Sequence, residues 1–421
     1  MAMNITEKIL ANHSGNEEVV PGQLVDVNLD LVYAHDVTGP PAFKMMENHG
    51  WRKVFDPEKV VLAPDHFVPP KDIQSAELYR IVKEWGEKHH VKNFYPIGRH
   101  GIAHIIVEEQ GYVTPGMTII SADSHTVHQG AFGAFATGVG STDLAAALHT
   151  GKLWFRVPES MKFVVDGKFQ KGVYSKDLIL KVITDIKVDG ALYKAMEWQG
   201  SGLKNMSMDA RTTLTNMAIE AGAKSGIMNP DEITIDYVKA RTKKKFTVYK
   251  SDDDADYSME FHYNLNELEP IVSFPASPDN GKAISEINEK IYVDQAYIGS
   301  CTNAKIEDLR IVAEILDGNK VAEGTRMLIV PTTTGVWNQA LKEGLFEIFT
   351  SAGATISTPS CGACIGAYMG ILGSKDTCIT SINRNFSGRM GHKSAKIFLA
   401  SPATVAASAI KGYIADPRDY L

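Results

Sequence analysis

The chain has 421 residues, of which 44% are hydrophobic and 22% charged, and this excludes a disordered, collagen-like or small disulfide-stapled protein. The formal net charge of −7 provides no overall positive field for nucleic acid or an anionic membrane. No apolar stretch reaches the roughly 18 residues of a membrane span, and the first residues show no signal-peptide core. Because four cysteines are too few for a disulfide framework, we expect a cytoplasmic protein.

The N-terminal third alternates between short apolar runs and a helical pattern. Residues 60–63 and 117–120 are apolar runs that end at polar residues, as strands do, and residues 75–88 have the apolar spacing of an amphipathic helix. A chain in which strands alternate with helices at this spacing favours a mostly parallel α/β sheet.

Less regular patterns follow, and then the alternation returns. Residues 163–165 and 178–186 are predicted as a strand and a helix, and prolines and a glycine over residues 270–281 predict a linker. The last third has the following expected elements: strands at 293–298, 327–330, 354–357 and 377–381, and helices at 306–316 and 337–350. We therefore expect three α/β domains, at residues 1–157, 158–287 and 288–421.

Cysteines and histidines are segregated along the chain. All four cysteines lie in the last 121 residues, whereas 11 of the 13 histidines lie in the first 150. If soft metal ligands and proton-transfer groups serve one site, that site must lie between domains.

Three of the cysteines follow predicted strands. Cys301, Cys361 and Cys364 would meet at the carboxyl edge of one sheet, where ligands bind in open α/β folds. The Cys-x-x-Cys pair alone is compatible with a redox pair, half a zinc site or an iron–sulfur loop. Cys378 lies inside an apolar strand and is expected to be structural. Three thiolates are one short of filling an iron–sulfur cube, which would leave one iron open as a Lewis acid.

The same edge is expected to carry two arginines. Arg384 and Arg389 are five residues apart in a segment that follows the predicted strand at 377–381. Since arginine binds carboxylates in a bidentate way and keeps its charge, this pair beside a metal indicates a di- or tricarboxylate substrate.

Candidate proton-transfer groups occupy the N-terminal part. Asp65–His66 and the segment Asp123–His125 each put a carboxylate beside an imidazole at the end of a predicted strand, which suits a general acid. His104 lies between them in sequence. In addition, Asn216 and Glu220 are four residues apart on a helical pattern, so that both side chains can face one cleft.

Together these sequence motifs resemble those of the aconitase superfamily. They occur in the same order as in that superfamily, and the resemblance extends from about residue 6 to residue 417. Those that carry the resemblance are Pro64–His66, Ala122–Thr126, Gly299–Asn303, Cys361–Gly366 and Asn383–Arg389. Within the superfamily the chain is most similar to the large subunits of the isopropylmalate isomerases, on Gly133–Asp143, Lys152–Pro158 and Ser381–Gly391. The resemblance implies a dehydration and rehydration reaction of leucine biosynthesis that proceeds through isopropylmaleate.

The resemblance also implies residue roles. Cys301, Cys361 and Cys364 correspond to the ligands of one 4Fe-4S cluster, and Arg384 and Arg389 to substrate-binding arginines. His66 with Asp65 corresponds to the acid that protonates the leaving hydroxyl. The remaining assignments pair His104 with Asp123 and His125 with Glu220, place Asn216, Asn303 and Asn383 near the cluster, and make His35 a substrate contact.

Aconitases also carry a C-terminal swivelling domain, which supplies a base serine and a further arginine. This chain stops where that domain would begin, so we expect a separate small subunit, in a heterodimer or heterotetramer, to supply these residues. Three alternatives remain open: a large subunit of homoaconitase or of a citramalate- or dimethylmalate-type hydro-lyase, a cluster-free RNA-binding regulator, and a zinc-binding structural protein. The net charge of −7 argues against RNA binding, and neither nucleic acid nor membrane is expected as a partner.

Overall fold

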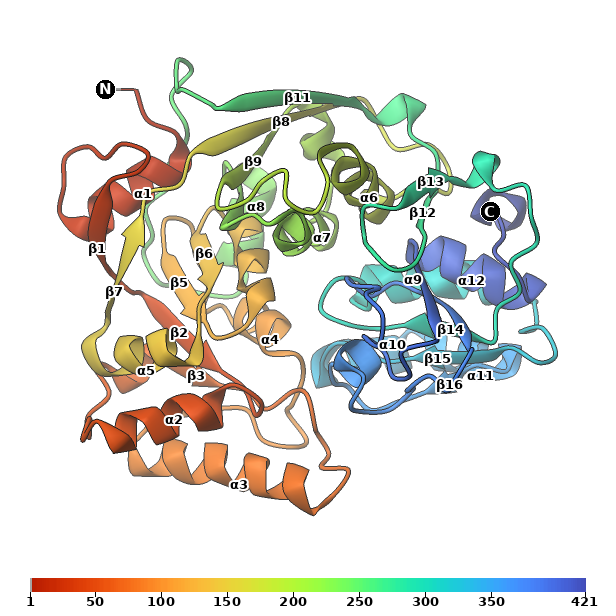
Figure 1. Cartoon of the computed structure of the whole chain (residues 1–421), viewed down its shortest axis with the longest axis horizontal. Coiled ribbons are helices and arrows are strands. Elements are labelled where there is room, and N and C mark those ends of the chain that lie inside the picture. The colour runs from red at the N-terminus through yellow and green to blue at the C-terminus, as the bar shows by residue number, and fades with distance from the viewer. Residues whose placement is uncertain (1) are drawn as a thin grey trace.

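A computed structural model describes residues 2–421 of the chain. The strands of this part form sheets of five, four and seven strands and one two-stranded ribbon, and most neighbouring strands within the three larger sheets are parallel. Figure 1 shows two lobes, with the first 150 residues on the left and the last 130 on the right. None of the described helices is long and apolar enough to span a membrane. The predicted α/β class with mostly parallel sheets is confirmed.

The amino-terminal lobe is built on the five-stranded parallel sheet, with strand order β4-β3-β2-β5-β6. Its strands are β2 (Leu31–Ala34), β3 (Val60–Leu62), β4 (Asn93–Phe94), β5 (Thr118–Ser121) and β6 (Phe135–Gly138). The helices are α1 (Ile5–Ser14), α2 (Gly39–Asn48), α3 (Ile73–Lys88), α4 (Ala103–Glu109) and α5 (Ser141–Thr150), and β1 (Leu24–Asn28) and β7 (Lys152–Arg156) form the antiparallel ribbon. Every residue of β2, β3 and β5 is buried, because helices cover both faces of a parallel sheet.

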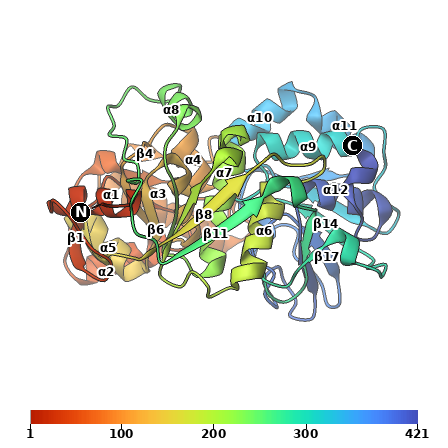
Figure 2. The ribbon, with the colours of Figure 1, turned by 90° about the horizontal axis from the view of Figure 1, so that it is seen from above.

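The middle of the chain forms the four-stranded parallel sheet, with order β10-β9-β8-β11. Its elements are β8 (Ser160–Asp166), β9 (Ala195–Gln199), β10 (Ser225–Met228), β11 (Met259–Asn264), α6 (Ser175–Ile186), α7 (Met208–Asn216) and α8 (Glu232–Lys239). Figure 2 shows β8 and β11 running side by side between the two lobes.

The carboxy-terminal lobe contains the seven-stranded sheet, with order β13-β12-β18-β17-β14-β15-β16. Its strands are β12 (Ile271–Ser273), β13 (Gly281–Ala283), β14 (Gln295–Ile298), β15 (Arg326–Ile329), β16 (Thr355–Ile356), β17 (Thr377–Thr380) and β18 (Lys396–Leu399). Its helices are α9 (Ile306–Leu316), α10 (Thr334–Lys342), α11 (Leu345–Ala352) and α12 (Pro402–Lys411).

Two predictions about this lobe were wrong. The predicted linker at 270–281 contains β12 and part of β13, which pair with each other, and β12 also pairs with β18. The predicted helix at 337–350 is two helices, because Gly344 between them adopts the left-handed conformation with φ of +76°.

The division into three domains remains a proposal. Its second boundary, between residues 287 and 288, separates β12 and β13 from the sheet to which they are hydrogen-bonded. One hydrophobic core contains both Trp198 of β9 and Leu399 of β18, so the middle and carboxy-terminal parts also share buried surface. A boundary just before Ile271 agrees better with the strand pairing.

Candidate active site

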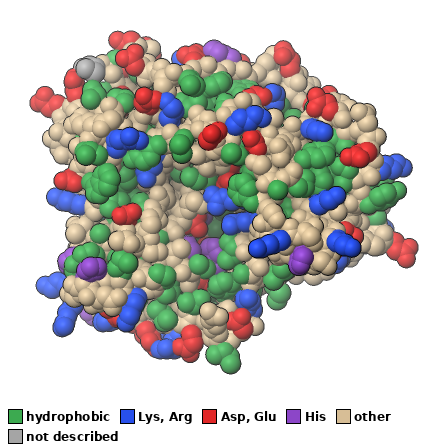
Figure 3. All heavy atoms as spheres, viewed as in Figure 1, with side chains coloured by type: hydrophobic (Ala, Val, Ile, Leu, Met, Phe, Trp, Pro, Cys, Tyr) green, Lys and Arg blue, Asp and Glu red, His purple; other side chains and the backbone are tan. Residues whose placement is uncertain are grey.

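A cavity of about 250 Å³ lies between the two lobes, at the carboxyl ends of their parallel strands. Its walls come from loops that follow β2, β3 and β5 on one side and β14, β16 and β17 on the other. Figure 3 shows a hollow in the middle of this face with histidine side chains at its floor. The predicted position of the site, between domains, agrees with this cavity.

Twelve of the predicted site residues line the cavity. They are His35, Asp65, His66, His104, Asp123, His125, Cys301, Cys361, Cys364, Asn383, Arg384 and Arg389. Glu220 and Asn216 lie directly behind its wall, where they bond to residues that line it. Asn303 does not take part: its amide donates to Thr213 and Asp308, and it lines a different cavity.

The Cys361–Cys364 pair lies on a short 3-10 turn that follows β16. The two cysteines are joined by a disulfide, which differs from the two separate thiolates expected of metal ligands. Their Cα atoms are 5.8 Å apart, a separation that a disulfide can bridge. Gly362 makes the turn possible: its φ is +61°, and a Cβ atom there would overlap the Tyr297 hydroxyl.

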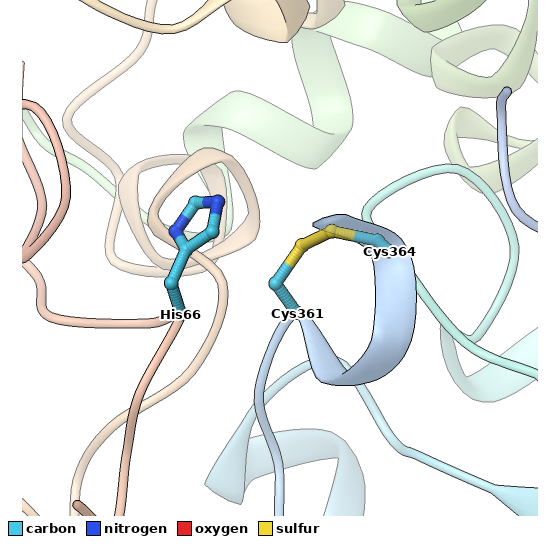
Figure 4. Close-up of side chains that lie close together, drawn as sticks. All are labelled: His66, Cys361 and Cys364. Carbon is cyan, nitrogen blue, oxygen red and sulfur yellow. A yellow bond between two sulfur atoms is a disulfide. The ribbon is translucent and has the colours of Figure 1, made fainter. Parts of the chain in front are cut away.

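His66 faces this cysteine pair across the cavity, although it comes from the opposite lobe (Figure 4). One ligand atom from each of His66, Cys361 and Cys364 lies within 4.8 Å of the others. Cys301 lines the same cavity and is a free, buried cysteine. Cys378 is buried within β17 and does not line the cavity, as expected of a structural residue.

The Cys301 sulfur accepts hydrogen bonds from two side-chain amides. Asn216 Nδ2 lies 3.2 Å from Cys301 Sγ, and Asn383 Nδ2 lies 3.6 Å from it. Hydrogen bonds to sulfur are one of the ways in which a protein tunes an iron–sulfur cluster. Three cysteines on one buried cavity, with amide donors behind one of them, are chemically suited to hold such a cluster once the Cys361–Cys364 bond is reduced.

The His66 imidazole is held by a carboxylate. Its Nδ1 lies 2.5 Å from Asp65 Oδ1, and both residues are buried. Although burial opposes the charged imidazole, the Asp65 carboxylate raises the pKa of His66 to about 9. The ring is therefore doubly protonated and positively charged at neutral pH, and its Nε2–H group is not bonded to Asp65.

Asp36, which the sequence analysis did not select, fixes the loop that carries this pair. Its carboxylate accepts the backbone N–H groups of Asp65, His66 and Phe67 at 2.8–3.0 Å. Asp36 is 1% exposed, so these bonds are made in the interior. The sequence did contain a hint to Asp36, because this residue directly follows the predicted site residue His35.

A second imidazole–carboxylate pair lies beside the first. His104 Nε2 lies 3.0 Å from Asp123 Oδ1, and the Tyr33 hydroxyl lies 2.6 Å from His104 Nδ1. Since a carboxylate only accepts, His104 Nε2 carries a proton and donates it to Asp123, while Nδ1 is hydrogen-bonded to the Tyr33 hydroxyl. Burial opposes ionisation of Asp123, but His104 outweighs it, and the pKa of Asp123 is well below its usual range.

His35 lies between the two pairs. Its ring stacks on His66 with 4.5 Å between the centroids. Its Nε2 is 3.5 Å from Asp123 Oδ2, and its Nδ1 is 3.8 Å from Asp65 Oδ1. The three histidines and two aspartates thus form one continuous polar wall.

Glu220 connects His125 to Arg384. Its Oε1 lies 2.9 Å from His125 Nε2, and Arg384 Nε donates to both of its oxygens at 2.9 Å. Arg384 also donates to the hydroxyl of Ser124, which lies within the segment Asp123–His125 and for which no role was predicted.

Arg389 differs from Arg384 in having no anionic partner. Within residues 2–421 its guanidinium forms no ion pair, and its buried Nε has no hydrogen-bond partner. Burial, together with the neighbouring charge of Arg384, lowers the pKa of Arg389 from its usual value. A half-buried guanidinium with free donors in a cavity is suited to bind a carboxylate.

Comparison with known proteins identifies the family of the chain. The sequence pattern of the Aconitase family (aconitate hydratase) matches residues 7–292 and 285–412. The chain belongs to the aconitase family, which confirms the predicted superfamily and the predicted class of enzyme, a hydro-lyase.

Curated relatives match over nearly their whole length. The "3-isopropylmalate dehydratase large subunit" of Caldicellulosiruptor saccharolyticus is 52% identical over 99% of this chain and 97% of that protein. The protein of the same name from Aquifex aeolicus is 52% identical, over 100% and 98%. "3-isopropylmalate dehydratase large subunit 1" of Pyrococcus abyssi is 51% identical, over 100% and 99%. Among solved structures, aconitase X of Thermococcus kodakaraensis shares the fold, with a TM-score of 0.53, 14% identity and 93% coverage of both chains.

Proposed function

We propose that this chain is the large, catalytic subunit of a 3-isopropylmalate dehydratase. The reaction interconverts 2-isopropylmalate and 3-isopropylmalate through isopropylmaleate, in the leucine biosynthesis of the cytoplasm. The observation that carries the proposal is the cavity, on which three cysteines, the His66–Asp65 pair and the unpaired guanidinium of Arg389 meet. The names of relatives about half identical over their full length support the choice of substrate.

Cys301, Cys361 and Cys364 would hold one 4Fe-4S cluster. The cavity carries these three cysteines and the buried Cys378 lies elsewhere, so the protein has three cysteines that could serve as cluster ligands. When bound, such a cluster supplies one open iron, a Lewis acid for a hydroxyl and a carboxylate. Because Cys361 and Cys364 are joined, an external two-electron reductant, such as a dithiol, would first have to convert their disulfide into two thiols.

The other residues would bind the substrate and move its protons. Arg389 would bind a carboxylate with its free donors, and Arg384, which Glu220 holds by its Nε, lines the same cavity. His66 gives the proton that leaves with the hydroxyl, and Asp65 orients it.

The other two histidine–carboxylate pairs would orient the hydroxyl group of the substrate and the water molecule. His104 is oriented by Asp123, and His125 by Glu220. His35, which lies against both Asp65 and Asp123, is assigned a substrate contact. Asn216 and Asn383 face the Cys301 sulfur, whereas the proposed role of Asn303 beside the cluster is not supported by its contacts with Thr213 and Asp308.

A small subunit is the proposed partner, in a heterodimer or heterotetramer. It would bring the base serine and a further arginine to the mouth of the cavity. The relatives' name, "large subunit", supports such a partner. Since positioned proton transfer contributes about 10²–10⁴-fold to a rate, the large subunit alone should turn over at least about 100-fold more slowly than the assembled pair.

The ligand assignment can be tested with two matched cysteine variants. Anaerobic reconstitution of the reduced wild-type chain should give the absorbance of a 4Fe-4S cluster, with four irons and four acid-labile sulfides. Cys364→Ser should lose this cluster, whereas Cys378→Ser, which removes an equally buried cysteine of β17, should retain it. A Cys364→Ser chain with the wild-type spectrum and iron content would refute the assignment.

The substrate assignment needs the assembled enzyme. Turnover should be fastest with 3-isopropylmalate when it is compared with homocitrate, citramalate and dimethylmalate at equal concentration. Preference for one of the other acids would retain the hydro-lyase class and reject the proposed substrate.

A further inference from the structure

A chain of buried polar side chains runs away from Cys301, behind the cavity wall. His128 Nδ1 lies 3.1 Å from Asn216 Nδ2, and the same amide nitrogen lies 3.2 Å from the Cys301 sulfur. On its far side His128 Nε2 lies 2.9 Å from Glu108 Oε2. His128 and Asn216 are fully buried, and Glu108 is 4% exposed. Neither His128 nor Glu108 lines the cavity, and neither has a role in the proposed reaction.

The other end of the chain fixes which way the Asn216 amide points. The Thr302 hydroxyl donates to Asn216 Oδ1 at 2.8 Å, and Asn383 Nδ2 donates to that hydroxyl at 3.0 Å. The Thr302 hydroxyl accepts the N–H of Asn383 with a lone pair. Its single proton therefore remains available, and it is donated to Asn216 Oδ1. Asn216 therefore presents its oxygen to Thr302 and its NH₂ group to Cys301 and His128.

This orientation sets the tautomer of His128. One N–H of Asn216 points to the sulfur and the other to His128 Nδ1, which must therefore be unprotonated. The ring proton is then on Nε2 and is donated to Glu108. A doubly protonated ring would turn an N–H toward the Asn216 amide and favour the rotated amide, with its oxygen against the sulfur.

The surroundings keep the imidazole neutral. Burial, and then the positive charge of Lys305, lower the pKa of His128 well below its usual value. The groups that face the ring are His104, stacked at 6.3 Å between centroids, and Glu108, whose own pKa burial raises well above its usual value. Both shifts favour the neutral forms of His128 and Glu108, which agrees with the acceptor role that the Asn216 amide gives to Nδ1.

We propose that His128 is a positioning residue, which holds Asn216 so that its amide donates a hydrogen bond to the sulfur of Cys301. The inference rests on the proposed function, in which Cys301 binds the cluster. An N–H···S bond withdraws electron density from the ligating thiolate, and it favours the reduced cluster, which carries more negative charge. Residues that orient metal ligands from behind change metal affinity by about 10–100-fold when they are replaced.

Two substitutions at position 128 distinguish the effect of losing the Nδ1 acceptor from the effect of losing the other contacts of the ring. Asn can place its Oδ1 close to where Nδ1 of His lies, so His128→Asn retains an acceptor for Asn216. His128→Leu has a similar volume and no acceptor. Both variants lose the bond to Glu108, and His89→Leu, which removes a buried histidine that packs on Trp85, serves as the control.

The measurements are made on the anaerobically reconstituted full chain. An EPR-monitored redox titration gives the midpoint potential of the cluster, ENDOR in H₂O and D₂O detects the exchangeable proton near sulfur, and a chelator gives the rate of iron loss. His128→Leu should move the potential to more negative values, weaken the exchangeable-proton coupling and release iron about tenfold faster or more. His128→Asn and His89→Leu should remain close to wild type.

Thr302→Val provides a second route to the same change, should His128→Leu not fold. It removes the donor to Asn216 Oδ1 and should shift the potential in the same direction. Equal shifts for His128→Leu and His128→Asn would assign the effect to Glu108 and overturn the inference, and so would an unchanged potential in both His128→Leu and Thr302→Val. A wild-type chain that binds no cluster would instead overturn the proposed function itself.

Discussion

The carboxylate of Glu220 holds the guanidinium of Arg384 by accepting the Nε proton on both of its oxygens, each at 2.9 Å. Glu220 is 5% exposed and the Arg384 side chain is 19% exposed, so replacing Glu220 by Gln leaves a largely buried cation without its counter-charge. Breaking a buried pair costs about 3–5 kcal/mol. We expect Glu220→Gln to lower kcat/KM about 100-fold or more and to lower the free energy of unfolding.

Glu343→Gln is the matched control for this prediction. Glu343 also accepts from an arginine, Arg310, but the pair lies on the surface, where an ion pair contributes about 0–1 kcal/mol. Steady-state kinetics of the assembled enzyme and urea denaturation should show a large effect at Glu220 only. Comparable effects at the two positions would contradict the role given to Glu220.

Arg389 is expected to determine substrate affinity. Arg389→Lys keeps the positive charge but removes the two-pronged donor, and a hydrogen bond to a charged group contributes about 1.5–3 kcal/mol. KM should therefore rise about 10–100-fold, with little change in the free energy of unfolding, because Arg389 has no partner to leave behind. Arg418→Lys, at an arginine paired with Asp416 outside the cavity, should leave KM unchanged.

Asp36 is expected to be required for the position of His66. Asp36→Ala would leave three backbone N–H groups without an acceptor, those of the buried Asp65 and His66 and of the half-buried Phe67, and a buried one costs about 1–3 kcal/mol. Thermal denaturation should show a loss of several kcal/mol, and activity should fall with it. Asp56→Ala, which removes an exposed carboxylate that accepts a single backbone N–H from Glu58, should cost about 1 kcal/mol and no activity. Equal losses at the two sites would argue against a special role of Asp36.

Glu109 is expected to make stability depend on pH. Burial raises the pKa of Glu109 to about 7 in the folded chain, against an ordinary value of about 4.5 for a glutamate side chain. The folded state binds this proton more tightly than the unfolded state, so the stability that it contributes is present below about pH 4.5 and is lost as the pH rises through about 7.

Glu109→Gln removes the charge and keeps an acceptor for the Thr333 hydroxyl. We expect the variant to match the wild type near pH 5 and to be more stable near pH 8, by on the order of 1 kcal/mol or more, since one pKa unit corresponds to about 1.4 kcal/mol. Urea denaturation at the two pH values checks this. A difference that is the same at both would refute the assigned pKa.

Most elements could be predicted where pattern and burial agree. The predicted strand at 60–63 and helices at 75–88 and 306–316 correspond to β3, α3 and α9, because apolar periodicity records which side of each element is buried. β12 and β13 could not be predicted, since three-residue strands among prolines are set by partners far along the chain, such as Leu399.

By itself, the sequence determined the order of the strands and helices and the presence of three cysteines, two arginines and the aspartate–histidine pairs. It did so because residue chemistry and local periodicity are properties of short segments. Only the tertiary structure decided that Glu220 serves Arg384 as well as His125, that Asn303 faces away, and that His128 and Asp36 support the site from behind. These relationships join residues up to 164 positions apart, and which buried donor meets which acceptor depends on how the lobes pack.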